Sequence, residues 1–400
     1  MKNLLKLDRV ELQCKRVLLR ADLNVPMKEG KVTDATRIQR FIPTLQYLHK
    51  AGAIVIVTSH LGRPKGKFNV EMSLKPVADS LAQLSNLRIE FIGESVGQES
   101  VAKTKEMNAG EVALLENLRF HLEEEANDSE FAEQLAAHAE IYVNDAFSAA
   151  HRAHASTHAI SKFLPAYAGP SMVAELEALQ AALGDPKRPV AALVGGAKVS
   201  SKIDVLQHLV QRMDKLIIGG GMANTFLLAH GKSIGKSLAE ADLVETAEAI
   251  LGKAKKSGCD ILLPVDAVVA NTLSADATCK TVHVDNVAKD QMILDVGSDS
   301  IELFNNHLAE CQTLLWNGPL GAFEVNPFGK GTFAVAKQAA KLTKTGKLLT
   351  VAGGGDTLAA LNVAEVAASF SYVSTAGGAF LEWLEGKELP GVSVLFESKF

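Results

Sequence analysis

VAGGGDTLAAL, residues 351–361, is the segment that shows how this chain is built. An apolar run ends in Gly353, Gly354 and Gly355, and a helix-like run follows Asp356 and Thr357. This order predicts a strand, a turn of bare backbone, and a helix with Asp356 and Thr357 at its N-cap. Backbone without Cβ atoms lets a ligand approach closely, and a helix N-terminus favours anions. A helix capped after a glycine turn, with no ligand, explains the same residues equally well.

The same alternation of apolar and amphipathic runs extends through the whole chain. Amphipathic segments such as RFIPTLQYLHKAG, EFAEQLAAHAEI and VSSKIDVLQHLVQRM predict helices. Ten apolar runs predict buried strands: RVLLR (16–20), AIVIVTS (53–59), VALLENLRF (112–120), IYVNDAF (141–147), AALVGG (191–196), KLIIGGG (215–221), DILLP (260–264), TLLWNGP (313–319), LLTVAGGG (348–355) and SYVSTAGG (371–378). Strands that alternate with helices predict an α/β fold, with parallel sheets covered on both faces.

Length and composition limit the classes of protein that fit. A chain of 400 residues predicts two domains. The net charge of −5 argues against nucleic-acid binding, because basic excess carries that affinity. No apolar run approaches the roughly 20 residues of a membrane span. The scattered cysteines favour a reducing compartment, so we expect a cytoplasmic protein that binds neither nucleic acid nor membrane. The cysteines are Cys14, Cys259, Cys279 and Cys311.

The boundary between the two domains is expected between residues 165 and 190. PAYAGPSM (165–172) supplies two prolines and a glycine, and GDPKRP (184–189) forms a second break. VAELEALQAAL (173–183) lies between the breaks and predicts one helix that ends at Gly184. That helix is a candidate connector between the domains.

Cationic side chains follow the predicted strands of the first half. In open parallel sheets, ligands bind beyond the carboxyl ends of the strands. Here those ends carry RADLNVP (20–26), SHLGRP (59–64), ENLRF (116–120) and NDAFSAAHRAHAST (144–157). Converging guanidinium groups would bind a small polyanion, although a single arginine is more often solvated. Asp22 and Asn24 would form hydrogen bonds with a ligand hydroxyl, or would instead form an Asx turn before Pro26. The cationic candidates are Arg37, His60, Arg63, Arg119, His151, Arg152 and His154.

Glycines follow the predicted strands of the second half. They would give a nucleotide base a flat slot, or would serve only tight strand–helix packing. Lys198 and Lys202 are four residues apart at a predicted helix start, so they would share one face and neutralise a phosphate, or be solvated. Glu324 would accept hydrogen bonds from ribose hydroxyls or lie at the surface. The segments are GGAKVSSK (195–202), GGGMA (219–223), NGPLGAFE (317–324), GGGDT (353–357) and STAGGA (374–379). The contrast between the halves predicts two anionic ligands, one on each domain, facing each other.

Several common site motifs do not occur in the sequence. GxxxxGK[ST] is absent, and no GxGxxG occupies the first strand–helix turn, which weakens a dinucleotide-dependent dehydrogenase as an alternative. HExxH is also absent, and the one GxSxG match, GKSIG (231–235), does not follow one of the predicted strands directly. Nothing predicts a cage of protein metal ligands, so Mg²⁺ would be held by substrate phosphates and Asp356.

Ten motifs in fixed order resemble one family. They are RADLNVP, TRIQRFIPTL, SHLGRP, ENLRF, DAFSAAHRAHAST, GGAKVSSKIDVL, IIGGGMANTF, WNGPLGAFE, GGGDT and STAGGA. Together they closely resemble phosphoglycerate kinase over about residues 16 to 380, and the tail LPGVSVL also fits. One departure is that the family commonly has Gly-Thr where this chain has Ser148 and Ala149, which bears on substrate geometry near Arg152.

The resemblance implies two Rossmann-like, three-layer domains with parallel sheets, joined by a helical hinge near Glu175 and Thr375. The N-terminal domain, 1–170, would bind 3-phosphoglycerate or 1,3-bisphosphoglycerate, and the tail 381–400 would pack back on it. The C-terminal domain, 171–380, would bind ADP or ATP with Mg²⁺. The family is also expected to be monomeric.

The resemblance also assigns residues by motif. Substrate would be bound by Asp22, Leu23, Asn24, Arg37, His60, Leu61, Gly62, Arg63, Arg119 and Arg152. Nucleotide would be bound by Lys202, Gly220, Gly221, Asn317, Glu324, Gly353, Gly354, Gly355, Asp356 and Thr357, with Asp356 on the metal. Catalysis would rest on Arg37, Lys198 and Lys202.

The implied reaction needs no general base. When 3-phosphoglycerate reacts with ATP, the attacking group is its carboxylate, which is already ionised at neutral pH. What remains is alignment and charge stabilisation, for which Arg37 and Lys202 would both contact the transferring group. Domain closure would bring the two ligands together and exclude water. A sugar-phosphate sensor without catalysis is the alternative from another class, but its chain should lack Lys202 and Asp356.

Overall fold

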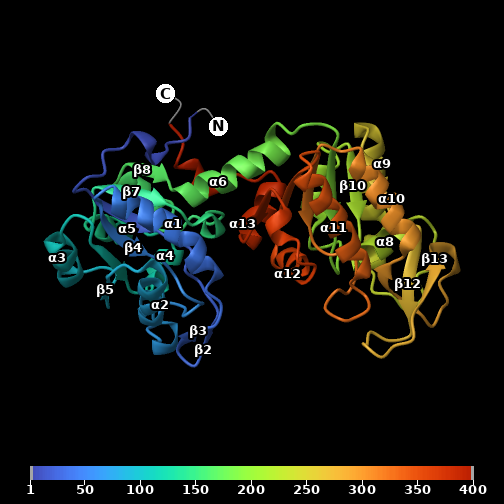
Figure 1. Cartoon of the computed structure of the whole chain (residues 1–400), viewed down its shortest axis with the longest axis horizontal. Coiled ribbons are helices and arrows are strands. Elements are labelled where there is room, and N and C mark those ends of the chain that lie inside the picture. Colours follow the sequence, from blue (N-terminus) through green and yellow to red (C-terminus); the bar gives the residue numbers. More distant parts are fainter. Residues whose placement is uncertain (1–2, 398–400) are drawn as a thin grey trace. The chain divides into compact units, whose positions relative to one another are not determined.

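The computed structural model describes residues 3–397 and divides into two compact units. Unit 1 holds the residues up to Glu177 together with those from Glu388 onward, and unit 2 is Ala178–Lys387. Their elements can be followed in Figure 1. The division after Glu177 lies later in the chain than the boundary predicted between residues 170 and 171. The reason is that the start of α6 (Pro170–Leu179) is hydrogen-bonded to unit 1. The backbone amides of Ser171 and Met172 donate to Asp145 Oδ1, at 2.8 and 3.1 Å.

Unit 1 is built on a six-stranded parallel sheet in the order β5-β6-β4-β1-β7-β8. The strands are β1 (Arg16–Arg20), β4 (Ile54–Thr58), β5 (Ile89–Ile92), β6 (Val112–Leu115), β7 (Ile141–Asn144) and β8 (Ala166–Ala168). The four inner strands were predicted from their apolar runs. The short edge strands β5 and β8 were not, because β5 carries Glu90 and β8 has only three residues. A small hairpin, β2 (Met27–Lys28) with β3 (Lys31–Val32), follows β1.

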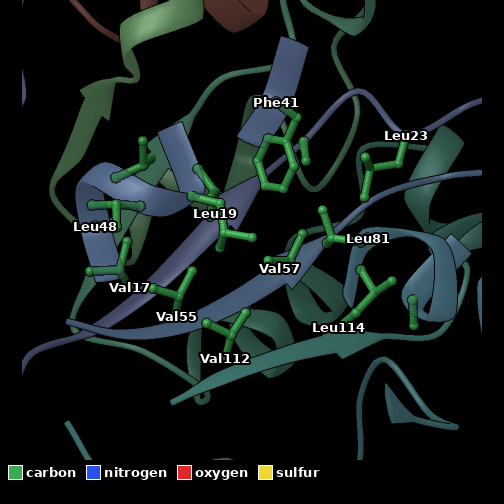
Figure 2. Packing of buried hydrophobic residues seen from close by; sticks show 14 of the residues in the cluster. Val17, Leu19, Leu23, Phe41, Leu48, Val55, Val57, Leu81, Val112 and Leu114 are labelled. Atoms are coloured by element: carbon green, nitrogen blue, oxygen red, sulfur yellow. The ribbon is translucent and has the colours of Figure 1, made fainter. Parts of the chain in front are cut away.

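Helices cover both faces of this sheet. They are α1 (Thr36–Lys50), α2 (Lys75–Ser85), α3 (Gln98–Glu106), α4 (Leu122–Glu125), α5 (Ser129–Ala136) and α14 (Pro390–Ser393). Figure 2 shows one face, where alternate residues of β1, β4 and β6, such as Val17, Val55 and Val112, meet Phe41 and Leu48 of α1. Alternation follows from the two-residue period of a strand, and burial of each large apolar side chain contributes about 1.5–3 kcal/mol. This packing fixes the positions of the strand ends.

Unit 2 repeats the architecture with a parallel sheet in the order β11-β10-β9-β15-β16-β17. Its strands are β9 (Val190–Val194), β10 (Lys215–Ile218), β11 (Asp260–Leu262), β15 (Thr313–Asn317), β16 (Leu349–Gly353) and β17 (Tyr372–Ser374). An antiparallel sheet, β13-β12-β14, was not predicted; it comprises β12 (Asp266–Ala270), β13 (Lys280–His283) and β14 (Met292–Val296). β13 is mostly exposed and has no apolar run, and Asp295 interrupts the apolar run of β14. The two six-stranded parallel sheets confirm the predicted α/β fold class.

The helices of unit 2 follow its strands. They are α7 (Ile203–Leu209), α8 (Gly221–Ala229), α9 (Val244–Ser257), α10 (Ser298–Ala309), α11 (Lys330–Lys344), α12 (Gly355–Val363) and α13 (Gly377–Leu384). The predicted connector is α6, which continues as a π-helical turn, η6 (Gln180–Gly184). Trp316 of β15, Phe304 of α10 and Phe370 are buried in the core of this unit.

The end of the chain returns to unit 1. The backbone amide of Leu5 donates to Leu395 O, and that of Gly391 to Ala150 O, both at 2.8 Å. Residues 381–387 of the predicted tail belong to unit 2 instead, and 398–400 lie outside the described residues. Within residues 3–397, the helices are all too short or too polar to span a bilayer.

Candidate active site

The strand order of unit 1 gathers the predicted cationic segments at one edge. The chain leaves β1 towards β4, β6 and β5, and later returns to the other side of β1 with β7 and β8. All these strands are parallel, so the segments after β6, β4, β1 and β7 emerge next to one another. A reversal of strand order is where open α/β sheets bind ligands.

The segment after β1 supplies a carboxylate, an amide and a guanidinium contact. Arg37, in the first turn of α1, donates through Nη1 to Asp22 Oδ1 at 2.7 Å. Asn24 Oδ1 accepts from Gly62 N at 2.9 Å, which ties this segment to the one after β4. Arg37 and Asn24 also border a cavity of about 400 Å³. The predicted Asx turn is therefore replaced by a contact between two strand ends.

Asn117 joins the segments after β4 and β6. Its Oδ1 accepts from Leu61 N at 3.2 Å, and its Nδ2 donates to Leu61 O at 2.8 Å. Arg119 then donates through Nη1 to Gly62 O at 2.9 Å. Burial lowers the pKa of Arg119, which is 7% exposed. Asn117 was not among the predicted site residues; its only signal was a polar residue in a strand-end segment.

Not every predicted cation shares this order. Arg63 and Arg152 are exposed, and Arg152 Nε donates to His151 Nε2 at 3.1 Å. His154 is buried, and burial lowers its pKa to about 4, so it is neutral at physiological pH. Ala149 is buried and Ser148 half-buried in the turn η4 (Phe147–Ala149) before Arg152. The set therefore divides into buried, hydrogen-bonded groups and exposed arginines that are free of that scaffold.

Lys202 lies at the switch point of unit 2. Its Nζ donates to Gly195 O, after β9, at 2.5 Å and to Asn317 O, after β15, at 3.1 Å. Burial lowers the pKa of Lys202 to about 8, while the Asp356 carboxylate acts in the opposite direction. The ammonium group is therefore mostly charged at neutral pH.

The predicted helical pairing of Lys198 with Lys202 is wrong. α7 begins only at Ile203, with Lys202 as its N-cap, and exposed Lys198 lies in the preceding loop. Lys202 N donates to Val199 O at 2.8 Å, a turn bond that replaces the first helical turn. The amide and hydroxyl of Ser200 bind Glu240, which holds this loop away from helical geometry.

The triple-glycine segment forms the strand, turn and helix expected, with a different cap. Gly354 is the N-cap of α12, at φ +101°, so Asp356 and Thr357 lie in the first turn rather than at the cap. Thr357 Oγ1 accepts from Gly318 N at 2.7 Å and donates to Gly353 O at 2.8 Å. Because Thr357 is used internally, the exposed carboxylate of Asp356 is the group presented to a ligand.

Tight packing accounts for some of these glycines but not for all of them. A Cβ on Gly220 would lie 2.7 Å from Gly196 O, and one on Gly221 would lie 2.6 Å from Ala197 O, so close backbone packing requires both. A Cβ on Gly353 would meet the ring of Phe380 at 2.6 Å. Gly355 differs, because a Cβ there would meet nothing within 4 Å. Protein packing therefore does not require a glycine at position 355, and ligand approach to Gly355 stays a prediction.

A cavity of about 360 Å³ opens beside these glycines. Gly196, Gly220 and Gly221 form part of its wall, and Glu324 and Asp356 also line it. The rest of the lining is mainly apolar: Leu227, Leu238, Leu273, Met292, Ile293 and Leu294. An apolar slot with polar groups at one side suits a nucleotide base, with its ribose and phosphates outside.

Three buried polar residues lie in or beside this cavity, and of these only Asn317 was predicted. Asn224 Oδ1 and Asn317 Oδ1 are buried without a hydrogen-bond partner among residues 3–397. Asp295 lines the cavity and accepts from Gly331 N at 2.8 Å, and burial raises its pKa to about 7. These residues come from α8, β14 and β15, and an isolated Asn or Asp in an apolar run gives little signal in sequence.

The donor set fits a magnesium ion that is carried mainly by phosphates. Within residues 3–397, no three His, Cys, Asp or Glu side chains cluster as a metal site. Asp356 offers one exposed carboxylate at a helix N-terminus, and Mg²⁺ commonly takes one or two carboxylates together with substrate phosphates.

Comparison with known proteins agrees across the chain. A family model described as phosphoglycerate kinase matches residues 7–387. Phosphoglycerate kinases of Rhizobium meliloti and of Chelativorans are each 58% identical to the chain over 388 residues, covering 97% of it and 97–98% of those proteins. The solved phosphoglycerate kinase of Coxiella burnetii superposes with a TM-score of 0.91 at 43% identity, covering 98% of both chains. That of Pyrococcus horikoshii superposes with 0.83 at 31% identity and the same coverage.

Proposed function

The chain belongs to the phosphoglycerate kinase family, and we propose that unit 1 binds the phosphoglycerate substrate while unit 2 binds the nucleotide. The family reaction is the glycolytic transfer of a phosphoryl group from 1,3-bisphosphoglycerate to ADP, which gives 3-phosphoglycerate and ATP. The observation that carries the assignment is the contrast between the two switch points. One gathers guanidinium and imidazole groups, and the other gathers glycine backbone around an apolar cavity.

In unit 1, the proposed contacts are those that the resemblance assigned. The loop from His60 to Arg63 and the residues Arg37, Arg119 and Arg152 would hold the carboxylate and phosphate of the substrate. Asp22 and Asn24 would meet its hydroxyl and help to fix the loop. Arg37 is half-buried at the entrance of a cavity, where its second face remains available to a ligand. A planar fork can bind two phosphate oxygens at once, which a lysine cannot do.

In unit 2, the proposed contacts begin at Lys202. Its ammonium group rests on two backbone carbonyls and would move to the transferring phosphoryl group. Gly353 to Thr357 would receive the phosphates at the N-terminus of α12, where free amides and the helix dipole favour anions. Gly220 and Gly221 would flank the base, Glu324 would accept from the ribose, and Asn317 would offer its unpaired Oδ1.

Mg²⁺ bound to the nucleotide would be held by Asp356. The ion would neutralise phosphate charge and orient the oxygens for in-line transfer. Asp356 would hold the metal charge near Lys202. Burial lowers the pKa of Lys202, and the Asp356 carboxylate offsets part of that effect. The acceptor carboxylate needs no base, so the remaining requirement on the chain is to align the two substrates and stabilise the charge between them.

Transfer requires the two bound substrates to meet with water excluded, so we also propose closure of the two units about α6. Small-angle scattering of the protein alone, with each substrate, and with both tests this proposal. Compaction only with both substrates is expected; a radius of gyration that is unchanged with both bound would contradict closure. We also propose that the protein is a monomer, and the molar mass from analytical ultracentrifugation in the same buffers tests this.

A coupled assay for ATP-dependent consumption of 3-phosphoglycerate tests the assignment. Asp356→Asn should lower turnover strongly and raise the Mg²⁺ concentration needed, while exposed Glu365→Gln, in unit 2 after α12, should behave as wild type. Equal activity of the Asp356 and Glu365 variants at limiting Mg²⁺ would remove Asp356 from the metal site. We further propose a cytoplasmic location, in keeping with four unpaired cysteines.

A further inference from the structure

Arg20, the last residue of β1, is a buried cation beneath the substrate side of unit 1. Its side chain is 1% exposed, and all three of its nitrogens have partners. Nη1 donates to Ala21 O at 2.6 Å, and Nε donates to Ser156 Oγ at 2.9 Å. Nη2 lies 2.9 Å from His60 Nδ1. Neither the ten strand runs nor the motif resemblance assigned Arg20 a role in the site.

The direction of each hydrogen bond follows from the chemistry of the guanidinium group. Arginine has only donors and stays protonated, so His60 Nδ1 must accept. A neutral imidazole that accepts at Nδ1 carries its proton on Nε2. The neighbouring hydrogen bonds are consistent with this direction. Ser156 Oγ accepts from Arg20 Nε and donates to Glu124 Oε1 at 2.6 Å. Among residues 3–397, the ring of His60 makes no other hydrogen bond.

The charges around His60 keep its ring neutral. Burial is the largest cause that lowers its pKa, well below the usual 6.5. The charged and titratable groups that face it act in the same direction: Arg20 from β1, Arg119 from η3 (Leu118–Phe120), His154 from the segment after β7, and Arg37 from α1. No carboxylate opposes them among the causes of this shift.

We propose that Arg20 is a positioning residue that holds His60 as the neutral Nε2–H tautomer, so that Nε2 donates a hydrogen bond to the anionic phosphoglycerate. This role rests on the proposed assignment of His60 to the substrate. A neutral donor recognises the anion without titrating near pH 6.5, so substrate affinity gains no pH dependence from this ring. Arg20 supplies the direction of the donor, and Glu124 fixes Arg20 through Ser156.

The tautomer can be read directly in the intact protein. Histidine labelled with ¹⁵N, observed through two-bond proton–nitrogen correlations, distinguishes Nδ1–H from Nε2–H, and His60→Gln assigns the signals. We expect an unprotonated Nδ1 and a protonated Nε2 between pH 5.5 and 8. A protonated Nδ1, or an imidazolium in this range, would overturn the proposal. Buried His138, which binds Thr104 and lies outside the site, is the internal reference.

Addition of 3-phosphoglycerate separates this proposal from the site assignment. If the Nε2 signal shifts on binding, both stand. If the tautomer is as expected but no His60 signal responds, His60 does not contact substrate; the assignment and the positioning role then fail together. A substrate response from a ring protonated on Nδ1 would instead keep the assignment and reject the role of Arg20.

Two pairs of variants give a second readout. The amide nitrogen of glutamine can reach the place of Nε2, whereas that of asparagine lies nearer to Nδ1. His60→Asn should therefore raise the KM for 3-phosphoglycerate by ~10-fold or more, as for a lost hydrogen bond to a charged group, and His60→Gln should raise it clearly less. Arg20→Met should let the Nδ1–H form appear and raise KM more than it lowers kcat, and Arg20→Lys should restore part of the Nε2–H population. If Arg20→Met does not fold, the wild-type spectrum and the His60 pair still decide the question; equal KM for Gln and Asn would count against Nε2 as the donor.

Discussion

A cation bridges the switch point of each unit, the buried Arg20 in unit 1 and the half-buried Lys202 in unit 2, but the two cations are held in different ways. Arg20 of unit 1 binds a hydroxyl, a carbonyl and an imidazole, and its own charge is permanent. Lys202 of unit 2 binds two backbone carbonyls, and burial brings its pKa to about 8. On the proposed assignment, side chains form the site in unit 1, whereas backbone and the Lys202 ammonium group form it in unit 2. The comparison then implies that a small acid is recognised by a hydrogen-bonded array of donors, while a nucleotide needs space and one charge that can move to its phosphates.

The largest expected effect is an opposite response of the two units to acid. In unit 1, burial lowers the pKa of His138 and of His154 to about 4, and that of His60 is also lowered. Below pH 6.5 the unfolded chain takes up protons that the folded unit does not, so the free energy of unfolding falls by up to ~1.4 kcal/mol per pH unit for each histidine. Buried Asp145, with a raised pKa, offsets part of this loss.

In unit 2, Asp295 has the opposite effect, and His208, whose pKa burial lowers, offsets part of it. Burial raises the pKa of Asp295 to about 7, so its contribution to stability is present at low pH and is lost as pH rises through 7. Hydrogen exchange at pH 7.5 and 5, corrected for intrinsic rates, should show lower protection of β1, β4 and β7 in acid while β9, β15 and β16 keep theirs. His138→Gln should make the acid loss in unit 1 less steep. Parallel loss in both units would contradict the contrast.

Arg37→Ala tests the rigid side of the comparison. Loss of a guanidinium contact to the transferring group should lower turnover at saturating substrates by on the order of 10²-fold or more. Arg37→Lys should recover little, because it keeps the charge but not the fork. The exposed Lys50, at the other end of α1, provides the control as Lys50→Ala. Normal turnover of Arg37→Ala would remove this residue from the reaction.

The next prediction concerns Lys202 and the pH dependence of ADP binding to unit 2. Since its pKa in the free protein is about 8, the ammonium group loses its proton above that pH. Binding of ADP phosphates favours the charged form, so affinity should fall by up to ~tenfold per pH unit above pH 8. Calorimetric titration with ADP between pH 7 and 9.5 measures this slope. Lys202→Arg should remove the slope, and exposed Lys198→Met should leave it; a flat profile in the wild type would mean that Lys202 does not meet the phosphates.

A pair of glycines gives the smallest and most local test. Gly220→Ala should destabilise the protein by about 1–3 kcal/mol, because φ is +69° and a Cβ would meet Gly196 O. Gly355→Ala should change stability by less than ~1 kcal/mol, because its Cβ would meet nothing, yet weaken ADP binding by about 1–3 kcal/mol. Thermal unfolding with and without ADP measures both. Unchanged ADP binding by Gly355→Ala would show that no ligand approaches this glycine.

Much of the fold could be predicted because the inner strands are apolar on both faces. RVLLR became β1 with the expected bounds, and IYVNDAF became β7 over its first four residues. The antiparallel sheet β13-β12-β14 could not be predicted, because strands such as KTVH are mostly exposed and have no continuous apolar run. Helix starts were also misjudged. α7 begins late, at Ile203, because Ser200 binds the distant Glu240, whereas α12 begins early, at Gly355, because Gly354 adopts a positive φ at the cap.

The sequence could predict those site residues that belong to a single recognisable segment. The segments after the strands gave His60, Arg119 and the triple glycine, because each follows a recognisable strand, and the motif TRIQRFIPTL gave Arg37. Asn117 and Arg20 could not be assigned this way, since their roles lie in bonds between segments that are up to 136 residues apart. Apolar positions such as Met292 carry no mark of the cavity that they line.

A crystal structure of the protein with 3-phosphoglycerate, ADP and Mg²⁺ tests the central claim most directly. The account predicts the glycerate on unit 1, within hydrogen-bond distance of His60 Nε2 and the Arg37 and Arg119 guanidinium groups. It predicts the phosphates at Gly354 to Asp356 of unit 2, with Lys202 turned away from Gly195 O towards them. Both ligands on one unit, or guanidinium groups directed away from the acid, would contradict it.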